Sequence, residues 1–281
     1  MQNIWKKIGI GIVIIFAIIG FGLTAGFFAI KWGWTNTSGV IDNQRQDFLN
    51  GSQNQDTAST TAYWVNLPEW QTIKAAILKD KATIDRASAV SGIPSRLLVA
   101  PLVVEQLRFF TDDRESFKKF FEPLKILGSQ TQFSWGVMGI KEETAIQIEK
   151  NLTDTTSPFY LGPDYAHMLD FSVASAKSYG GPKQERFARM TDQHNHYYSY
   201  LYAGLYIRQI EAEWKSAGFD ISNRPEIIAT LYNIGFAGSK PNVNPQSGGA
   251  QIPISPDHIY SFGSLAREFY NSNELLDEFP K

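Results

Sequence analysis

The feature that most constrains the fold is a helical pattern of apolar residues, which continues from Leu67 to the C-terminal region. In one segment after another, apolar residues recur three and four positions apart, the spacing that gathers them on one face of an α-helix. No convincing run of alternating apolar and polar residues, the pattern of a half-buried strand, accompanies them. The sequence therefore predicts an all-α domain. The predicted helical segments are residues 67–92, 94–110, 115–127, 141–152, 164–180, 184–218, 224–235 and 257–276.

A separate apolar segment precedes this domain. The run from Ile8 to Ile30 is uncharged over 23 residues, and as a helix it would span the hydrocarbon core of about 30 Å. It is longer than the apolar part of a secretory signal, so we expect residues 1–34 to be an uncleaved, single-pass transmembrane anchor. Lys6 and Lys7 precede the run, which favours a location in the cytoplasmic membrane with the domain on the extracytoplasmic side.

A polar linker and one domain complete the predicted organisation of the chain. Residues 35–62 are rich in Asn, Gln, Ser and Thr, which predicts a flexible linker. Residues 63–281 then form one domain, and residues 242–256 within it predict a long loop of the kind that is often functional.

Composition excludes some classes of function. The net charge of −2 argues against a nucleic-acid-binding protein, which would need a basic face. The absence of cysteine excludes disulfides and thiolate metal sites.

One carboxylate interrupts the most apolar of the predicted helices. In LLVAPLVVEQLRFF, residues 97–110, Glu105 stands among aliphatic side chains. Such a helix is expected to be buried nearly all round, and an ionised carboxylate there is costly unless it is paired. Desolvation favours the neutral form of a carboxyl, which is how a general acid is prepared at neutral pH. Glu105 is therefore either a general acid or a structural acid neutralised by Arg96 or Arg108.

Three stretches, in this order, resemble segments of the lytic transglycosylase and goose-type lysozyme families of the lysozyme-like superfamily. They are SGIPSRLLVAPLVVEQ at 91–106, SWGVMGIKEETA at 134–145 and IIATLYNIG at 227–235. The stretch PDHIYSFGSLAREFYNS at 256–272 is similar, more loosely, to the closing tyrosine-containing helix of these families. The resemblance implies a lysozyme-like helical catalytic domain.

The resemblance also implies a site. Glu105 falls on the single catalytic acid, which protonates the leaving oxygen and then acts as the base while the 6-hydroxyl attacks. The product implied is a 1,6-anhydromuramyl end, and the partner is the peptidoglycan glycan strand. The expected substrate-binding residues, from the turn that lines the groove and from the Tyr-Asn pair that faces the acid, are Ser134, Trp135, Gly136, Met138, Tyr232 and Asn233.

Each of these residues also has a plainer interpretation. Trp135 and Met138 could fill the core, and Tyr232 could be a core aromatic residue with a satisfied hydroxyl. Asn233 could cap its own helix or bond the backbone of that helix.

The chain also departs from the family pattern in three places. Gln106 replaces the usual Ser, Gly139 replaces the usual Gln, and the segment 106–133 is longer than usual. Two alternatives therefore stay open: a hydrolytic muramidase of the same fold, or a non-catalytic glycan-binding or scaffolding protein of the cell wall.

Neither a metal nor a cofactor is expected. His194 and His196 are two positions apart, so on a helix they would not share a face, and a solvated or core role is favoured. Asp112, Asp113 and Glu115 could offer a second carboxylate, although acids in the first turn of a helix explain them more simply.

Overall fold

The computed structural model describes residues 62–111, 134–172, 177–192, 194–255 and 257–281. These residues are mostly helical, as the helical pattern predicts. Within these ranges, no helix has the length and apolar character needed to cross a membrane. The predicted anchor, the predicted linker up to residue 61 and the predicted helix at 115–127 all lie outside the described residues.

The helices of the described part vary from ten to 20 residues. They are α3 (Pro68–Lys79), α4 (Lys81–Ser91), α5 (Ser95–Thr111), α7 (Glu142–Thr153), α9 (Pro182–Thr191), α10 (Tyr197–Ser216), α11 (Pro225–Ile234) and α12 (Phe262–Asn271). Three short 3₁₀ turns are at Tyr63–Asn66, Pro163–Tyr165 and Phe236–Gly238.

Within the described residues, two small antiparallel hairpins accompany the helices. The first pairs β1 (Ser134–Trp135) with β2 (Ile140–Lys141), and the second pairs β3 (Gln251–Ser255) with β4 (His258–Ser261). The sequence analysis missed both hairpins, so the all-α prediction is accurate only as far as the helices go. The strands of the first are too short for their alternation to be recognised, and Pro253 interrupts the second.

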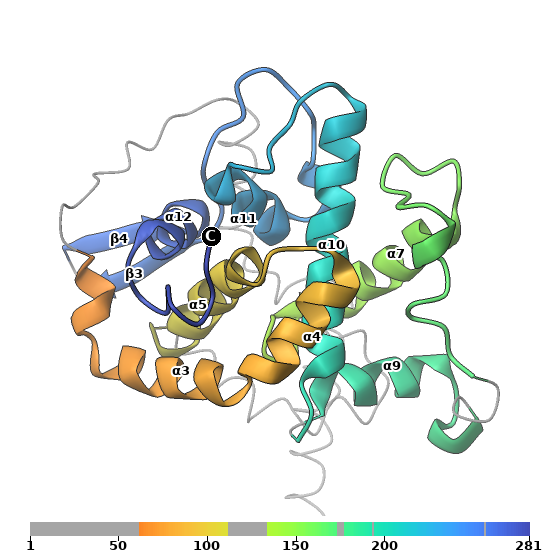
Figure 1. The fold of residues 1–281 in the computed structure, drawn as a ribbon, viewed down its shortest axis with the longest axis horizontal. Helices are drawn as coiled ribbons and strands as arrows, with labels where there is room; N and C mark the ends of the chain where they lie inside the picture. Colours follow the sequence, from red (N-terminus) through yellow and green to blue (C-terminus); the bar gives the residue numbers. More distant parts are fainter. Residues whose placement is uncertain (1–61, 112–133, 173–176, 193, 256) are drawn as a thin grey trace, which may run out of the picture.

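Helix α5 lies near the middle of the domain. It contacts α3 and α4 on one side and α11 and α12 on the other (Figure 1). The aliphatic side chains along it are fully buried, as expected for a helix enclosed on most sides: Leu98, Val99, Ala100, Val103 and Val104. Since α5 carries Glu105, the core fixes the backbone from which this acid projects.

Two predicted helices are each divided in the structure. The predicted helix at 67–92 breaks at Asp80, whose carboxylate accepts a hydrogen bond of 2.7 Å from the Tyr200 hydroxyl on α10. The predicted helix at 184–218 breaks after Asp192, whose carboxylate accepts hydrogen bonds from backbone N–H groups just beyond it. In both places a short acidic side chain makes contacts that helical periodicity does not register.

Two further predictions are wrong in part. The predicted helix at 164–180 does not form over 166–172, where Arg189 binds the backbone carbonyls of Leu169 and Asp170. The predicted helix at 257–276 begins only at Phe262, after β4, and the predicted loop at 242–256 contains β3.

The C-terminal segment is fastened to the start of α5 by Arg96. The fully buried guanidinium donates hydrogen bonds of 2.8 to 3.1 Å to five backbone carbonyls, those of Phe269, Tyr270, Ser272, Glu274 and Phe279. Its hydrogen-bonding groups are thus directed to the backbone at and beyond the end of α12. The possibility that Arg96 neutralises Glu105 is therefore wrong.

Candidate functional site

Glu105 lies on the last turns of α5, and its side chain is 15% exposed. Arg108, one turn further on, brings its Nη1 atom to 3.6 Å from Glu105 Oε1. This distance is long for a hydrogen bond but short enough for an ion pair. The acid is therefore mostly enclosed, with a cation beside it and limited access to solvent.

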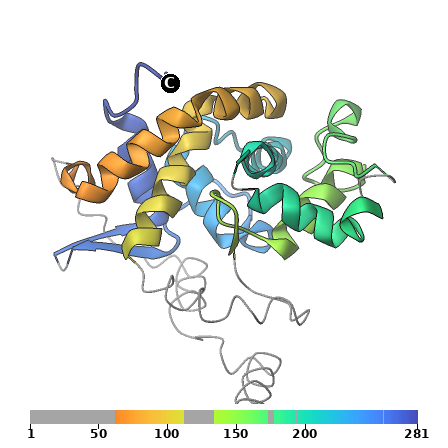
Figure 2. The ribbon, with the colours of Figure 1, turned by 90° about the horizontal axis from the view of Figure 1, so that it is seen from below.

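A tight turn faces Glu105. It joins β1 to β2 over residues 136–139, and Figure 2 shows this hairpin, in yellow-green, between α5 and α9. Gly136 and Gly139 have φ angles of +65° and +66°, the left-handed region that favours glycine. A Cβ atom on Gly136 would lie 2.2 Å from the carbonyl oxygen of Met190, so the turn packs directly on the backbone of α9.

Side chains from three helices hold the turn in place. The Gln106 side chain on α5 donates a 2.7 Å hydrogen bond to the carbonyl of Val137. The Ser199 hydroxyl on α10 accepts one of 3.3 Å from the Met138 N–H, and the Tyr232 hydroxyl on α11 donates one of 2.7 Å to the Met138 carbonyl. The turn is therefore fixed relative to α5, α10 and α11.

Tyr232 connects this turn to the acid. Its ring is buried against Tyr206, with 5.1 Å between ring centroids. Burial, together with the negative charge of nearby Glu105, raises the pKa of Tyr232 well above its ordinary value. The phenol therefore stays protonated and serves as a donor to Met138.

The structure brings Glu105, Met138 and Tyr232 together, but it assigns Met138 a core role. The Met138 side chain is fully buried, and the residue meets Tyr232 through its backbone carbonyl. Trp135 is 4% exposed and packs edge-on against Phe187, with 5.2 Å between ring centroids, so it too belongs to the core.

Asn233 and Ser134 both contact backbone groups of other segments. The Asn233 side chain accepts a 2.8 Å hydrogen bond from the Ala250 N–H and so holds the loop that leads into β3. Ser134 pairs with Lys141 in the β1–β2 ladder. The plainer interpretation, that Asn233 bonds the backbone of its own helix, does not describe this contact, because Ala250 lies outside α11.

The sequence analysis assigned no structural role to three positions in this site. Ser199 and Gln106 position the turn, and Gly139 lies directly against the Glu105 carboxylate. Gln106 and Gly139 had been noted only as departures from the family pattern. Gln106 was open to recognition, because it follows the acid on the same helix, whereas nothing near Ser199 in the sequence indicates its role.

The candidate metal residues do not assemble into a site. In the described ranges, no group of three His, Asp or Glu side chains could hold a metal ion. His196 instead contacts Asp80, with 2.5 Å between Nδ1 and Oδ2, and His194 is exposed. Asp112, Asp113 and Glu115 lie outside the described residues.

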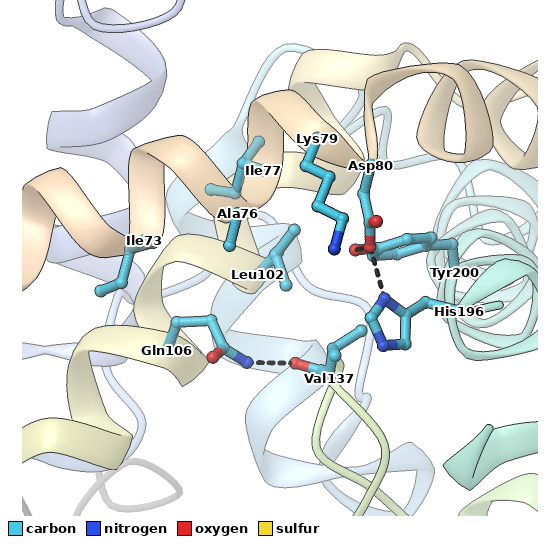
Figure 3. A pocket seen from close by; sticks show the side chains of 10 residues that line it. All are labelled: Ile73, Ala76, Ile77, Lys79, Asp80, Leu102, Gln106, Val137, His196 and Tyr200. Carbon is cyan, nitrogen blue, oxygen red and sulfur yellow. Dashed lines mark hydrogen bonds and ion pairs between the residues drawn. The ribbon is translucent and has the colours of Figure 1, made fainter. Parts of the chain in front are cut away.

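A cavity of about 160 Å³ lies beside this site, between α3, α5, the turn and the start of α10. Figure 3 shows the hydrogen bond from Gln106 to Val137 on its wall, and the contact of His196 with Asp80 at one end. Glu105 is not among its lining residues. Since successive residues of a helix are about 100° apart, Gln106 faces the cavity while Glu105 turns toward Gly139.

Compared with protein-family models, with curated proteins and with solved structures, the chain has no match. The case for a function therefore depends on the residues and geometry of the site itself.

Proposed function

We propose that this protein is a peptidoglycan lytic transglycosylase, in which Glu105 serves first as general acid and then as general base. The proposal is supported by the environment of this acid. The Glu105 carboxylate is mostly enclosed, lies against the glycine turn at 136–139 and has the buried, protonated Tyr232 nearby. A carboxyl that is partly desolvated yet reachable from solvent suits proton transfer to a glycosidic oxygen.

The proposed reaction needs one carboxyl group. Glu105, protonated, gives its proton to the oxygen that links N-acetylmuramic acid to N-acetylglucosamine, and the bond from the muramyl C1 to that oxygen breaks. The C6 hydroxyl of the same muramyl residue then bonds to C1 and returns its proton to Glu105. The products are a 1,6-anhydromuramyl end and a free N-acetylglucosamine 4-hydroxyl, and the acid is regenerated.

Tyr232 acts as an uncharged neighbour of the acid in this scheme. Because its pKa is raised, the phenol adds no second negative charge beside Glu105. Its hydrogen bond to Met138 also holds the turn against which the carboxylate lies. Its contribution is therefore to position the acid rather than to transfer a proton.

The proposal also includes a substrate, the peptidoglycan strand, and a location at the cytoplasmic membrane. The uncharged run at 8–30 would anchor the chain in the cytoplasmic membrane, with the domain on the extracytoplasmic side, where peptidoglycan strands lie. The aromatic residues around the site, Tyr206 and Tyr232 among them, pack in the core, so sugar recognition would depend more on hydrogen bonds than on stacking.

A second candidate is a non-catalytic glycan-binding or scaffolding protein. It is favoured by Arg108, because a cation 3.6 Å from Glu105 stabilises the ionised carboxylate and so opposes its use as an acid.

Mass spectrometry of digested peptidoglycan distinguishes these functions. Purified full-length protein in detergent is incubated with isolated peptidoglycan, and the soluble fragments are analysed. Anhydromuramyl ends support the proposal, reducing muramyl ends indicate a hydrolytic muramidase of the same fold, and no release indicates the scaffolding protein.

A further inference from the structure

We propose that Gly139 is a positioning residue for Glu105: its missing side chain makes the space in which the carboxylate lies. This inference depends on the proposed function, because it assigns Gly139 a role in the reaction. It gives a physical reason for a glycine where the resembling family has glutamine.

The geometry of this contact is close. A Cβ atom on Gly139 would lie 2.8 Å from both Cδ and Oε2 of Glu105, and 3.2 Å from Oε1. Non-bonded carbon atoms prefer separations of about 3.5–4.0 Å. A Cβ atom at this position would therefore be too close to the carboxylate, and one of the two groups would have to shift.

Other glycines of the chain show that this relation is specific. Gly218 also has a positive φ, +88°, but a Cβ there would meet nothing within 4 Å, so its conformation alone explains it. Gly136 is explained by the backbone of Met190 and the side chain of Ser199. At Gly139, in contrast, the nearest atoms are those of the acid itself.

The turn cannot easily withdraw to make room. Gln106, Ser199 and Tyr232 hold it from three helices, as described above. The Glu105 carboxylate, in contrast, is the far end of a flexible side chain. A methyl group at position 139 would therefore displace the carboxylate and leave the turn in place.

Because the turn is fixed and the carboxylate can move, Gly139→Ala should affect catalysis more than the stability of the fold. Gly218→Ala should lower the melting temperature by about 2–8 °C because of its positive φ, and Gly139→Ala by only slightly more, because it also moves a flexible carboxylate away from Arg108. Gly139→Ala alone should lower kcat for release of anhydromuramyl ends from soluble glycan oligomers, by about 10–100-fold, with KM within about twofold. Gly218→Ala should keep the wild-type kcat.

A double-mutant cycle with Glu105→Asp tests whether the effect passes through the acid. The shorter side chain ends one methylene earlier, which draws its carboxylate back from Gly139, so a methyl group at position 139 displaces it less. Added to Glu105→Asp, Gly139→Ala should therefore cause little further loss of the residual kcat.

Each result bears on either the proposed function or the positioning role of Gly139. If the wild-type protein releases no fragments, the proposed function fails. If it is active and Gly139→Ala matches Gly218→Ala in kcat, only the positioning role fails. A melting temperature far below that of Gly218→Ala, or full additivity with Glu105→Asp, also overturns it, since the methyl group would then act on the fixed fold instead of on the acid.

Discussion

Replacing Arg96 by methionine tests how the domain is held together. The substitution keeps an unbranched apolar stem but removes all five hydrogen bonds that the guanidinium donates to backbone carbonyls. Those of Tyr270, Ser272 and Glu274 are partly buried, so water can replace some of the lost bonds. The bonds to Phe269 and Phe279 are buried.

The magnitude follows from these two classes of carbonyl. An unsatisfied buried acceptor costs about 1–3 kcal/mol, and two buried carbonyls, those of Phe269 and Phe279, lose their donor. We therefore expect Arg96→Met to lower the free energy of unfolding by about 3–5 kcal/mol, which corresponds to a melting temperature lower by roughly 10 °C.

The assay is unfolding in urea followed by circular dichroism. Arg267→Met is the matched control, because Arg267 is an exposed arginine of α12. It should change the free energy of unfolding by less than about 0.5 kcal/mol. A loss of less than about 1 kcal/mol for Arg96→Met would refute the reasoning.

Two further predictions concern stability. Burial raises the pKa of Glu213 above its ordinary value of 4.5, and a hydrogen bond from Ser239 opposes this. The folded state therefore loses stability as pH rises above 4.5 toward the folded pKa. Glu213→Gln keeps an acceptor for Ser239 but cannot ionise. The free energy of unfolding of this variant, relative to wild type, should therefore be higher at neutral pH than at about pH 4. Equal differences at the two pH values would contradict this prediction. Gly136→Ala should cost about 2 kcal/mol or more beyond Gly218→Ala in urea unfolding, because its methyl group meets the Met190 carbonyl, and equal costs would show that the turn can move.

Local pattern was enough to predict most helices of the domain. The spacing of apolar residues and the Pro and Gly at its ends placed α11 correctly, and the same reasoning placed α5 and predicted its burial. The errors came from residues whose partners are elsewhere. Asp80 ends a helix because it bonds Tyr200 on another helix, and no window of sequence around Asp80 contains that partner.

The candidate site, too, could be predicted only as far as local pattern reaches. Glu105 stood out because a carboxylate in an apolar helix is unusual, and the resemblance grouped it with Tyr232. The contacts that fix the turn join residues 31, 61 and 94 positions apart, so their geometry could not be read from spacing. Gly139 is the clearest case, since the sequence showed only a departure from the family pattern, while in the structure a Cβ atom at this position would lie 2.8 Å from Glu105 Oε2.

The most direct measurement of the central claim is the rate at which full-length Glu105→Gln releases anhydromuramyl ends from peptidoglycan. Glutamine keeps the size of the side chain but cannot donate and recover the proton, so we expect a rate at least about 1,000-fold below wild type with an unchanged circular dichroism spectrum. Glu143→Gln, at an exposed position of α7, is the matched control and should keep the wild-type rate. A Glu105→Gln protein that released anhydromuramyl ends at the wild-type rate would contradict the assignment of this acid.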